Sequence, residues 1–194
     1  AVRAGTLLYL HGGAYCVGSP ATHRALTGRL ARATGMAVFA LDYRLAPEHR
    51  FPAAVDDAVA AARALADAGP VVLAGDSAGG GLALATAIAL RDAAGPRPAA
   101  LLLLSPWVDM AMDGTPPEPP PGEAMLSVPW AQACAAHCLG ATDPRHPWAS
   151  PLRADLAGLP PVLVQAGTDE LLHGQALALH AALEAAGVGA RCEI

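Results

Sequence analysis

Residues 75–79 read Gly-Asp-Ser-Ala-Gly, the G-x-S-x-G pattern that places a serine hydroxyl on a sharp turn between a strand and a helix. An apolar run, residues 71–74, precedes the pattern, and a long run of small and apolar residues, 80–90, follows it. Glycine has no Cβ, so the flanking strand and helix can approach closely. The pattern predicts Ser77 as a nucleophile, with the free N–H groups of the helix directed at it.

A glycine-rich loop, His-Gly-Gly-Ala at residues 11–14, follows the first apolar run of the chain. Acyl transfer passes through a tetrahedral oxyanion, which needs two or three fixed N–H donors. We predict that Gly12 and Gly13 supply two of these donors and that Ala78, directly after the serine, supplies the third. His11 is expected to orient the loop rather than to transfer protons.

The composition indicates one globular domain and argues against nucleic-acid binding and a membrane span. Hydrophobic residues make up 54% of the 194 residues and charged residues 15%, as expected for one domain with a large core. A net charge of −5 without a basic cluster excludes a nucleic-acid footprint. No apolar stretch has the roughly 18–20 residues of a membrane span. The four cysteines lack the spacing of a secreted framework, which favours reduced thiols in a cytoplasmic protein.

Apolar strand-like runs alternate with helical patterns along the chain, which predicts a mostly parallel α/β sheet with helices on both faces. The first residue is not methionine, and we expect the chain to be truncated at both termini. The expected strands are residues 6–10, 36–41, 71–75, 99–104, 162–166 and 190–194, and the expected helices are 22–34, 52–68, 80–90, 124–139 and 175–186.

Residues 110–148 interrupt this alternation. They begin with a proline-rich stretch, residues 116–121, which predicts a stiff extended piece, and continue into the helical pattern 124–139. An insertion between two strands beyond the serine turn is where a lid over a substrate would lie. A surface excursion without function is the alternative interpretation.

Four segments together carry a resemblance to a known family: residues 11–14, 42–54, 75–80 and 105–109. In content and order they resemble the hormone-sensitive-lipase-like family of α/β hydrolases, the fold-3 group of bacterial carboxylesterases and lipases. The resemblance implies an α/β-hydrolase fold with one partial catalytic domain over 1–194, a lid at about 110–148, and no metal or cofactor. Ala14 replaces the more common glycine, but its backbone can still donate.

The resemblance also implies a triad of serine, acid and histidine in that order. Aligned on Gly167 and Leu172, the acid position holds Glu170, with Asp169 as the competing candidate. Both carboxylates could instead be solvated. The family's histidine follows the final strand, and none of the seven histidines of this chain occupies that position. We therefore expect the histidine to lie beyond Ile194 and the isolated fragment to be impaired.

The resemblance thus implies hydrolysis of small, hydrophobic, short-acyl esters through an acyl-enzyme. Two alternatives are a non-catalytic receptor with a hydrolase fold and a lactone or amide hydrolase. We expect a small ester substrate as the partner, and we expect neither nucleic-acid binding nor a membrane span. A homodimer is a further option that the sequence does not decide.

Two further groups have structural interpretations. The charged residues of segment 42–48 (Asp42, Arg44 and Glu48) are expected to form a buried or half-buried network that braces the oxyanion loop. Cys134, His137 and Cys138 have a helical spacing that favours packing over a metal site.

Overall fold

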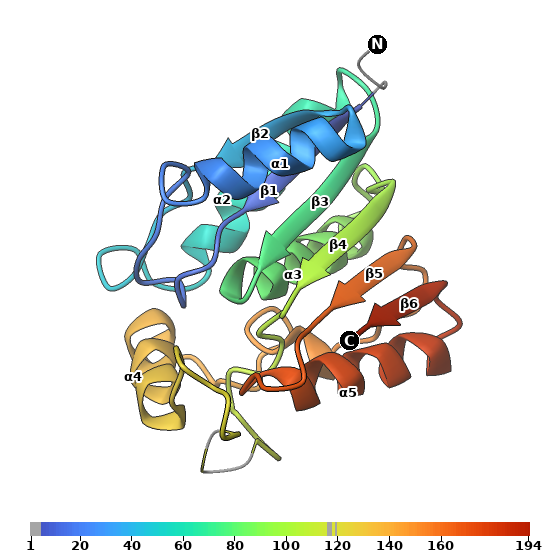
Figure 1. The fold of residues 1–194 in the computed structure, drawn as a ribbon. Coiled ribbons are helices and arrows are strands. Elements are labelled where there is room, and N and C mark those ends of the chain that lie inside the picture. The colour runs from blue at the N-terminus through green and yellow to red at the C-terminus, as the bar shows by residue number, and fades with distance from the viewer. Residues whose placement is uncertain (1–4, 116–117, 119) are drawn as a thin grey trace.

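The computed structural model describes residues 5–115, 118 and 120–194. They contain a six-stranded sheet with the order β2-β1-β3-β4-β5-β6, and every pairing is parallel (Figure 1). The predicted strands are confirmed, with ends shifted by a residue or so. They are β1 Thr6–Leu10, β2 Ala37–Leu41, β3 Val71–Asp76, β4 Ala100–Leu104, β5 Val162–Gln165 and β6 Ala190–Glu193.

Helices cover both faces of the sheet, as predicted. α1 lies in front of the sheet in Figure 1, and α2 and α3 lie behind it. A small apolar cluster around Leu7, Tyr9 and Ala74 joins the sheet to α1, whereas the main core joins it to α2, α3 and α5. The helices are α1 Arg24–Thr34, α2 Ala53–Ala66, α3 Ala78–Asp92, α4 Val128–Leu139 and α5 His173–Ala185, with a 3₁₀ turn, η1, at Pro151–Arg153.

The helix α3 is the central helix of the core. Its residues from Ala78 to Leu90 are all buried, because small side chains let the helix lie close to the sheet and to α2. The parallel strands all end at one edge, and α3 begins at that edge, directly after β3. The turn between β3 and α3 is therefore held rigidly at the carboxyl end of the sheet, where ligands bind in α/β folds.

The insertion between β4 and β5 lies beyond the carboxyl ends of the strands and carries α4 (Figure 1). α4 begins at Val128 and not at Ala124 as predicted. Ser127 caps it by accepting the Trp130 N–H, while Glu123 accepts two N–H groups that precede the helix. The predicted extended piece lies partly outside the described residues, at Pro116, Pro117 and Pro119. A lid role for the insertion stays a prediction.

Both ends of the insertion are fixed to the body of the molecule. Asp109 is buried and pairs with Arg153, so the start of the insertion is tied to the 3₁₀ turn η1. The buried Ser150 hydroxyl accepts the Met110 N–H and donates to the Pro144 carbonyl, so it joins the two ends. Within the described ranges, every helix is too short or too polar to cross a bilayer.

Candidate active site

Ser77 lies on the sharp turn that the sequence predicts. Its backbone angles are φ 50° and ψ −120°, a region that non-glycine residues rarely adopt and that costs about 1–3 kcal/mol. The Ser77 N–H donates to the Leu104 carbonyl at 2.9 Å. The Ser77 carbonyl accepts the N–H groups of Gly81 and Trp107 at 3.1 and 2.9 Å. Bonds from β4, α3 and the loop after β4 therefore hold the strained conformation.

Two glycines allow the close packing around the turn. A Cβ placed on Gly79 would lie 2.0 Å from the Leu10 carbonyl oxygen, and one on Gly75 would lie 2.3 Å from the Gly79 carbonyl oxygen. Both distances are far shorter than any real contact, so only glycine fits. The first turn of α3 thus touches the end of β1, which brings the loop of residues 11–14 beside Ser77.

The loop after β1 is itself strained. Gly13, Ala14 and Tyr15 have φ values of 124°, 52° and 62°, and the latter two are not glycines. The N–H groups of Cys16 and Val17 both donate to the Gly13 carbonyl at 3.0 Å, which closes a tight turn. Consecutive left-handed residues turn the backbone amides of this loop away from the bonding pattern of a helix or strand.

Gly12 does not offer the free donor that the sequence analysis expects. Its N–H donates to Asp76 Oδ1 at 2.9 Å, and a Cβ at this position would lie 2.2 Å from Asp76 Oδ2. The N–H groups of Gly13, Ala14 and Ala78 have no hydrogen-bond acceptor among the described residues. The predicted set of donors, Gly12, Gly13 and Ala78, leaves out Ala14, although the backbone of Ala14 was expected to be able to donate.

Asp76 joins three elements at the site. Its carboxylate accepts the Tyr9 hydroxyl of β1 at 2.6 Å and the Gly12 N–H of the loop, and it lies 3.3 Å from His23 Nε2 at the start of α1. Burial and the Asp76 charge raise the pKa of Tyr9 well above its ordinary value. Sequence reasoning missed this role, although Asp76 directly precedes the candidate nucleophile.

His11 contacts the backbone of the loop. Its ring is buried and stacks on Tyr43 with the ring centres 4.3 Å apart, and its Nδ1 lies 2.8 Å from the Gly12 carbonyl. The Tyr43 hydroxyl donates to the His11 carbonyl at 2.7 Å. Burial lowers the pKa of His11, so the ring is neutral at pH 7.

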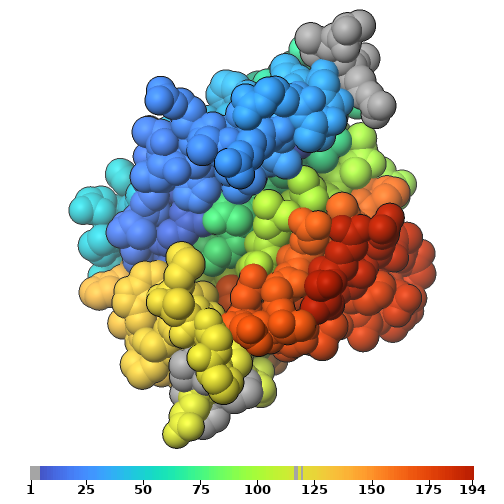
Figure 2. Space-filling model, viewed as in Figure 1, coloured from blue at the N-terminus to red at the C-terminus, as the bar shows by residue number. Residues whose placement is uncertain are grey.

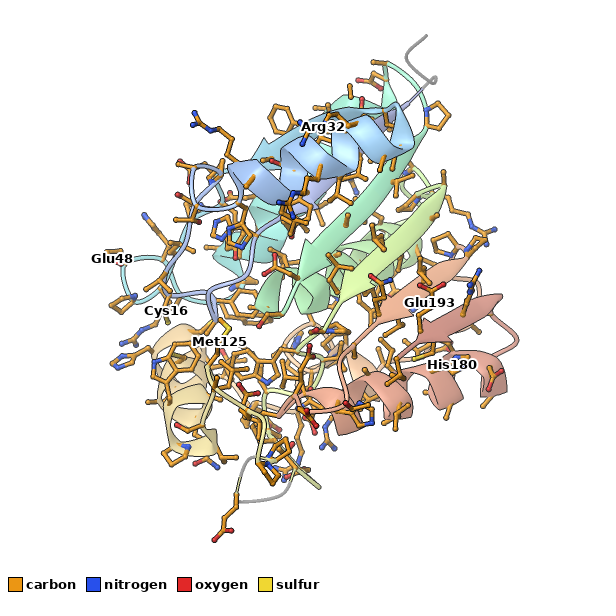
Figure 3. The ribbon with its side chains drawn as sticks, viewed as in Figure 1. Cys16, Arg32, Glu48, Met125, His180 and Glu193 are labelled. Carbon is orange, nitrogen blue, oxygen red and sulfur yellow. The ribbon has the colours of Figure 1, made fainter. Side chains whose placement is uncertain are left out.

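The expected network of Asp42, Arg44 and Glu48 is wrong. All three residues are exposed, and Glu48 lies at the outer edge of the molecule (Figure 3). Arg44 instead forms a two-pronged ion pair with Asp57 of α2. Charged side chains at the surface keep their hydration there, and the buried Tyr43 between them braces the loop.

The two candidate acids point in different directions. Glu170 lines an open depression of about 500 Å³ at the ends of β4, β5 and β6, together with Ser105 and Glu193. Its Oε2 is buried and has no hydrogen-bond partner among the described residues. Asp169 is exposed and lies against Gly122 of the insertion. Of the two candidate acids, only Glu170 therefore lines this depression.

None of the seven histidines, all of which the structure describes, forms a hydrogen bond with the side chain of Ser77 or Glu170. His173 begins α5 and directs Nδ1 to the Gly167 carbonyl at 2.9 Å, and His180 lies 3.8 Å from Glu184. The cysteines are all free thiols, and the described residues hold no group of three side chains suited to a metal ion.

Comparison with known proteins agrees with this geometry. A profile of the alpha/beta hydrolase fold family matches residues 7–194. An acetyl-hydrolase of Streptomyces hygroscopicus is 52% identical over 187 residues, which cover 94% of this chain and 62% of that protein. An esterase of Acinetobacter venetianus is 40% identical over 174 residues, covering 86% of this chain and 57% of that protein.

Solved structures extend the agreement to three dimensions. An esterase of the bacterial hormone-sensitive lipase family superposes with a TM-score of 0.92 at 46% identity, covering 98% of this chain and 66% of that one. The esterase EstE5 superposes with a TM-score of 0.93 at 44% identity and the same coverage. The chain thus spans about three fifths of the length of the acetyl-hydrolase and the esterase from Acinetobacter, and about two thirds of the length of the two solved structures. It belongs to the α/β-hydrolase fold family, within its hormone-sensitive-lipase-like group.

Proposed function

We propose that the protein carrying this chain is a serine carboxylesterase that acts on small, apolar, short-acyl esters. The observation that carries the proposal is the strained Ser77 turn beside a loop whose backbone N–H groups have no described acceptor. Nucleophile and oxyanion donors must stand on rigid neighbouring backbone for acyl transfer. Relatives named as an acetyl-hydrolase and an esterase support the same chemistry.

In this mechanism Ser77 Oγ attacks the ester carbonyl and a histidine accepts its proton. The N–H groups of Ala78, Gly13 and Ala14 then bind the oxyanion. Ala78 lies at the first turn of α3, where the helix dipole adds to the stabilisation. Gly12 contributes through its bond to Asp76 and not by a direct bond to the oxyanion. Collapse of the intermediate expels the alcohol, and water hydrolyses the acyl-enzyme by the same route.

We assign the acid role to Glu170 and place the histidine outside residues 1–194. Glu170 lines the depression at the ends of β4–β6, which has room for an imidazole ring, and its buried Oε2 has no hydrogen-bond partner among the described residues. A buried carboxylate costs free energy unless it gains a partner, and the N–H of a histidine is a suitable one. In a protein without that histidine, the same site would bind a ligand without turning it over.

The preference for apolar esters is supported by an exposed apolar side chain in the loop that carries the proposed oxyanion donors. Val17 lies in this loop, three residues after Ala14, and is 56% exposed. Exposed apolar residues at the rim of a site contribute area for an acyl or alcohol group.

Hydrolysis of p-nitrophenyl acetate by the protein expressed from its complete reading frame tests the proposal. Ser77→Ala should lower kcat by a factor on the order of 10⁵–10⁶ and abolish labelling by a fluorophosphonate. Glu170→Ala should lower kcat by a factor on the order of 10⁴. Its matched control, Asp169→Ala, should change kcat by less than about threefold, because that residue is exposed and does not line the depression.

Undiminished turnover by Ser77→Ala would remove the nucleophile assignment. The reverse ranking of the two acid variants would transfer the acid role to Asp169. Absence of both ester turnover and fluorophosphonate labelling of Ser77 in the wild-type protein would favour the receptor. A lactone or an amide hydrolysed faster than p-nitrophenyl acetate would change the substrate class.

A further inference from the structure

Glu123 reaches from the insertion to the loop that carries Glu170. Its Oε2 accepts the Leu171 N–H at 2.8 Å, across 48 residues of sequence. Its Oε1 accepts the N–H groups of Met125 and Leu126 at 2.7 and 2.9 Å. One carboxylate therefore bonds both to the turn that precedes α4 and to the residue directly after the candidate triad acid.

The same two segments also pack against each other. A Cβ on Gly122 would lie 2.5 Å from the Asp169 Cβ. The backbone of the insertion therefore touches residues 166–172, the loop between β5 and α5 that we call the acid loop, beside the Glu123 bond. In Figure 2 the yellow surface of the insertion lies against the orange surface of the later chain. The contact extends over neighbouring residues on both sides.

The acid loop is also fixed from its other end. The His173 N–H donates to the Glu170 carbonyl at 3.0 Å, and His173 Nδ1 lies 2.9 Å from the Gly167 carbonyl. Leu171 is buried, so its N–H needs a protein acceptor, which Glu123 supplies. Glu170 is thus held between the start of α5 and a carboxylate of the insertion.

The charge state of Glu123 suits this role. Desolvation alone would raise the pKa of its carboxyl, but the backbone N–H donors outweigh it and the pKa lies below its ordinary value. Glu123 is therefore ionised at neutral pH. An ionised carboxylate offers two acceptor oxygens, whereas the glutamine amide offers one oxygen and places an NH₂ group toward a donor.

We propose that Glu123 is a positioning residue for ester hydrolysis, which ties the insertion to the acid loop and holds Glu170 in place for the triad. The proposal rests on the proposed function, because it takes Glu170 as the triad acid. A displacement of about 1 Å at a catalytic group can cost on the order of 100-fold in rate, so a lost tie that shifts Glu170 by less should cost on the order of tenfold.

Glu123→Gln in the complete protein tests the tie directly through hydrogen exchange of the Leu171 amide. We expect this amide to exchange on the order of tenfold faster in Glu123→Gln. The kcat for p-nitrophenyl acetate should fall by the same order, with KM changed by less than about twofold, because substrate binding does not use Glu170. Glu118→Gln, an exposed glutamate of the same insertion, removes the same charge and should change neither quantity.

A second comparison separates positioning from a general loss of structure. In a Glu170→Gln background, Glu123→Gln should lower kcat by less than about twofold, because its effect passes through Glu170. If Glu123→Gln lowers kcat by the same factor in the wild-type and Glu170→Gln backgrounds, the positioning role is overturned. Unchanged exchange at Leu171 would overturn the tie itself. Since exchange needs no turnover, it also decides the tie if the ester assay fails and the proposed function falls.

Discussion

Asp76→Ala is the substitution whose effect can be worked out most fully from the structure. The carboxylate receives the Tyr9 hydroxyl at 2.6 Å and the Gly12 N–H at 2.9 Å, and it lies 3.3 Å from His23. Tyr9 is fully buried, so its hydroxyl depends on the Asp76 carboxylate for an acceptor. Alanine would leave that hydroxyl and the Gly12 N–H without an acceptor.

The cost follows from these contacts. Each hydrogen bond to a charged group contributes roughly 1.5–3 kcal/mol, so the two short bonds give a range of about 3–6 kcal/mol. The Asp76 side chain is 26% exposed, and water can solvate part of what remains, which favours the low end of the range. We expect Asp76→Ala to lower the free energy of unfolding by about 3 kcal/mol. Asp76→Asn keeps an acceptor oxygen and should cost about 1 kcal/mol.

Urea unfolding of the three proteins measures these differences, and ester turnover measures the consequence for the site. Because Gly12 adjoins the proposed oxyanion donors, kcat should fall in the same order, with alanine lowest. Tyr9→Phe combined with Asp76→Ala should cost less than the sum of the single changes, since both remove the same bond. A loss below about 1 kcal/mol for alanine, or equal losses for alanine and asparagine, would refute the reasoning.

Three further outcomes are expected. Gly79→Ala should cost about 3 kcal/mol or more in urea unfolding, because its Cβ would lie 2.0 Å from the Leu10 oxygen; Gly174→Ala, whose Cβ meets nothing within 4 Å, should be neutral or stabilising. Burial raises the pKa of the Cys16 thiol to about 12, so iodoacetamide at pH 8 should modify it roughly a thousandfold more slowly than a model thiol, as mass spectrometry would show. The pKa of Glu123 is lower in the folded than in the unfolded protein, so its carboxylate stabilises the fold above about pH 4.3 and loses this effect as pH falls through the folded pKa. The melting temperatures of Glu123→Gln and wild type should therefore converge as pH falls from about 5 to about 3. Parallel curves of melting temperature against pH would contradict this.

The local features of this chain were predictable from sequence. The strand before Ser77, the turn and the helix after it are neighbours along the chain, so one short pattern specifies all three. Apolar runs interrupted by helical patterns likewise determine a parallel sheet covered on both faces. The start of α4 was predicted too early, because Ala124 and Leu126 fit the helical pattern. Glu123 accepts the N–H groups of Met125 and Leu126, so the irregular segment continues to Ser127 and the helix begins only at Val128.

Only the tertiary structure decided which polar groups meet. Gly12 and Asp76 are 64 residues apart, and nothing in the spacing of either residue shows that one N–H is donated to the other carboxylate. Asp169 and Glu170 are adjacent in a loop, where side-chain direction depends on packing against Gly122 and Gly167 and not on a repeating period. The sequence by itself determined the candidate nucleophile and the elements that carry it. The folded chain decided the partners of the surrounding charges, because a hydrogen bond requires a distance and a direction that only three-dimensional packing sets.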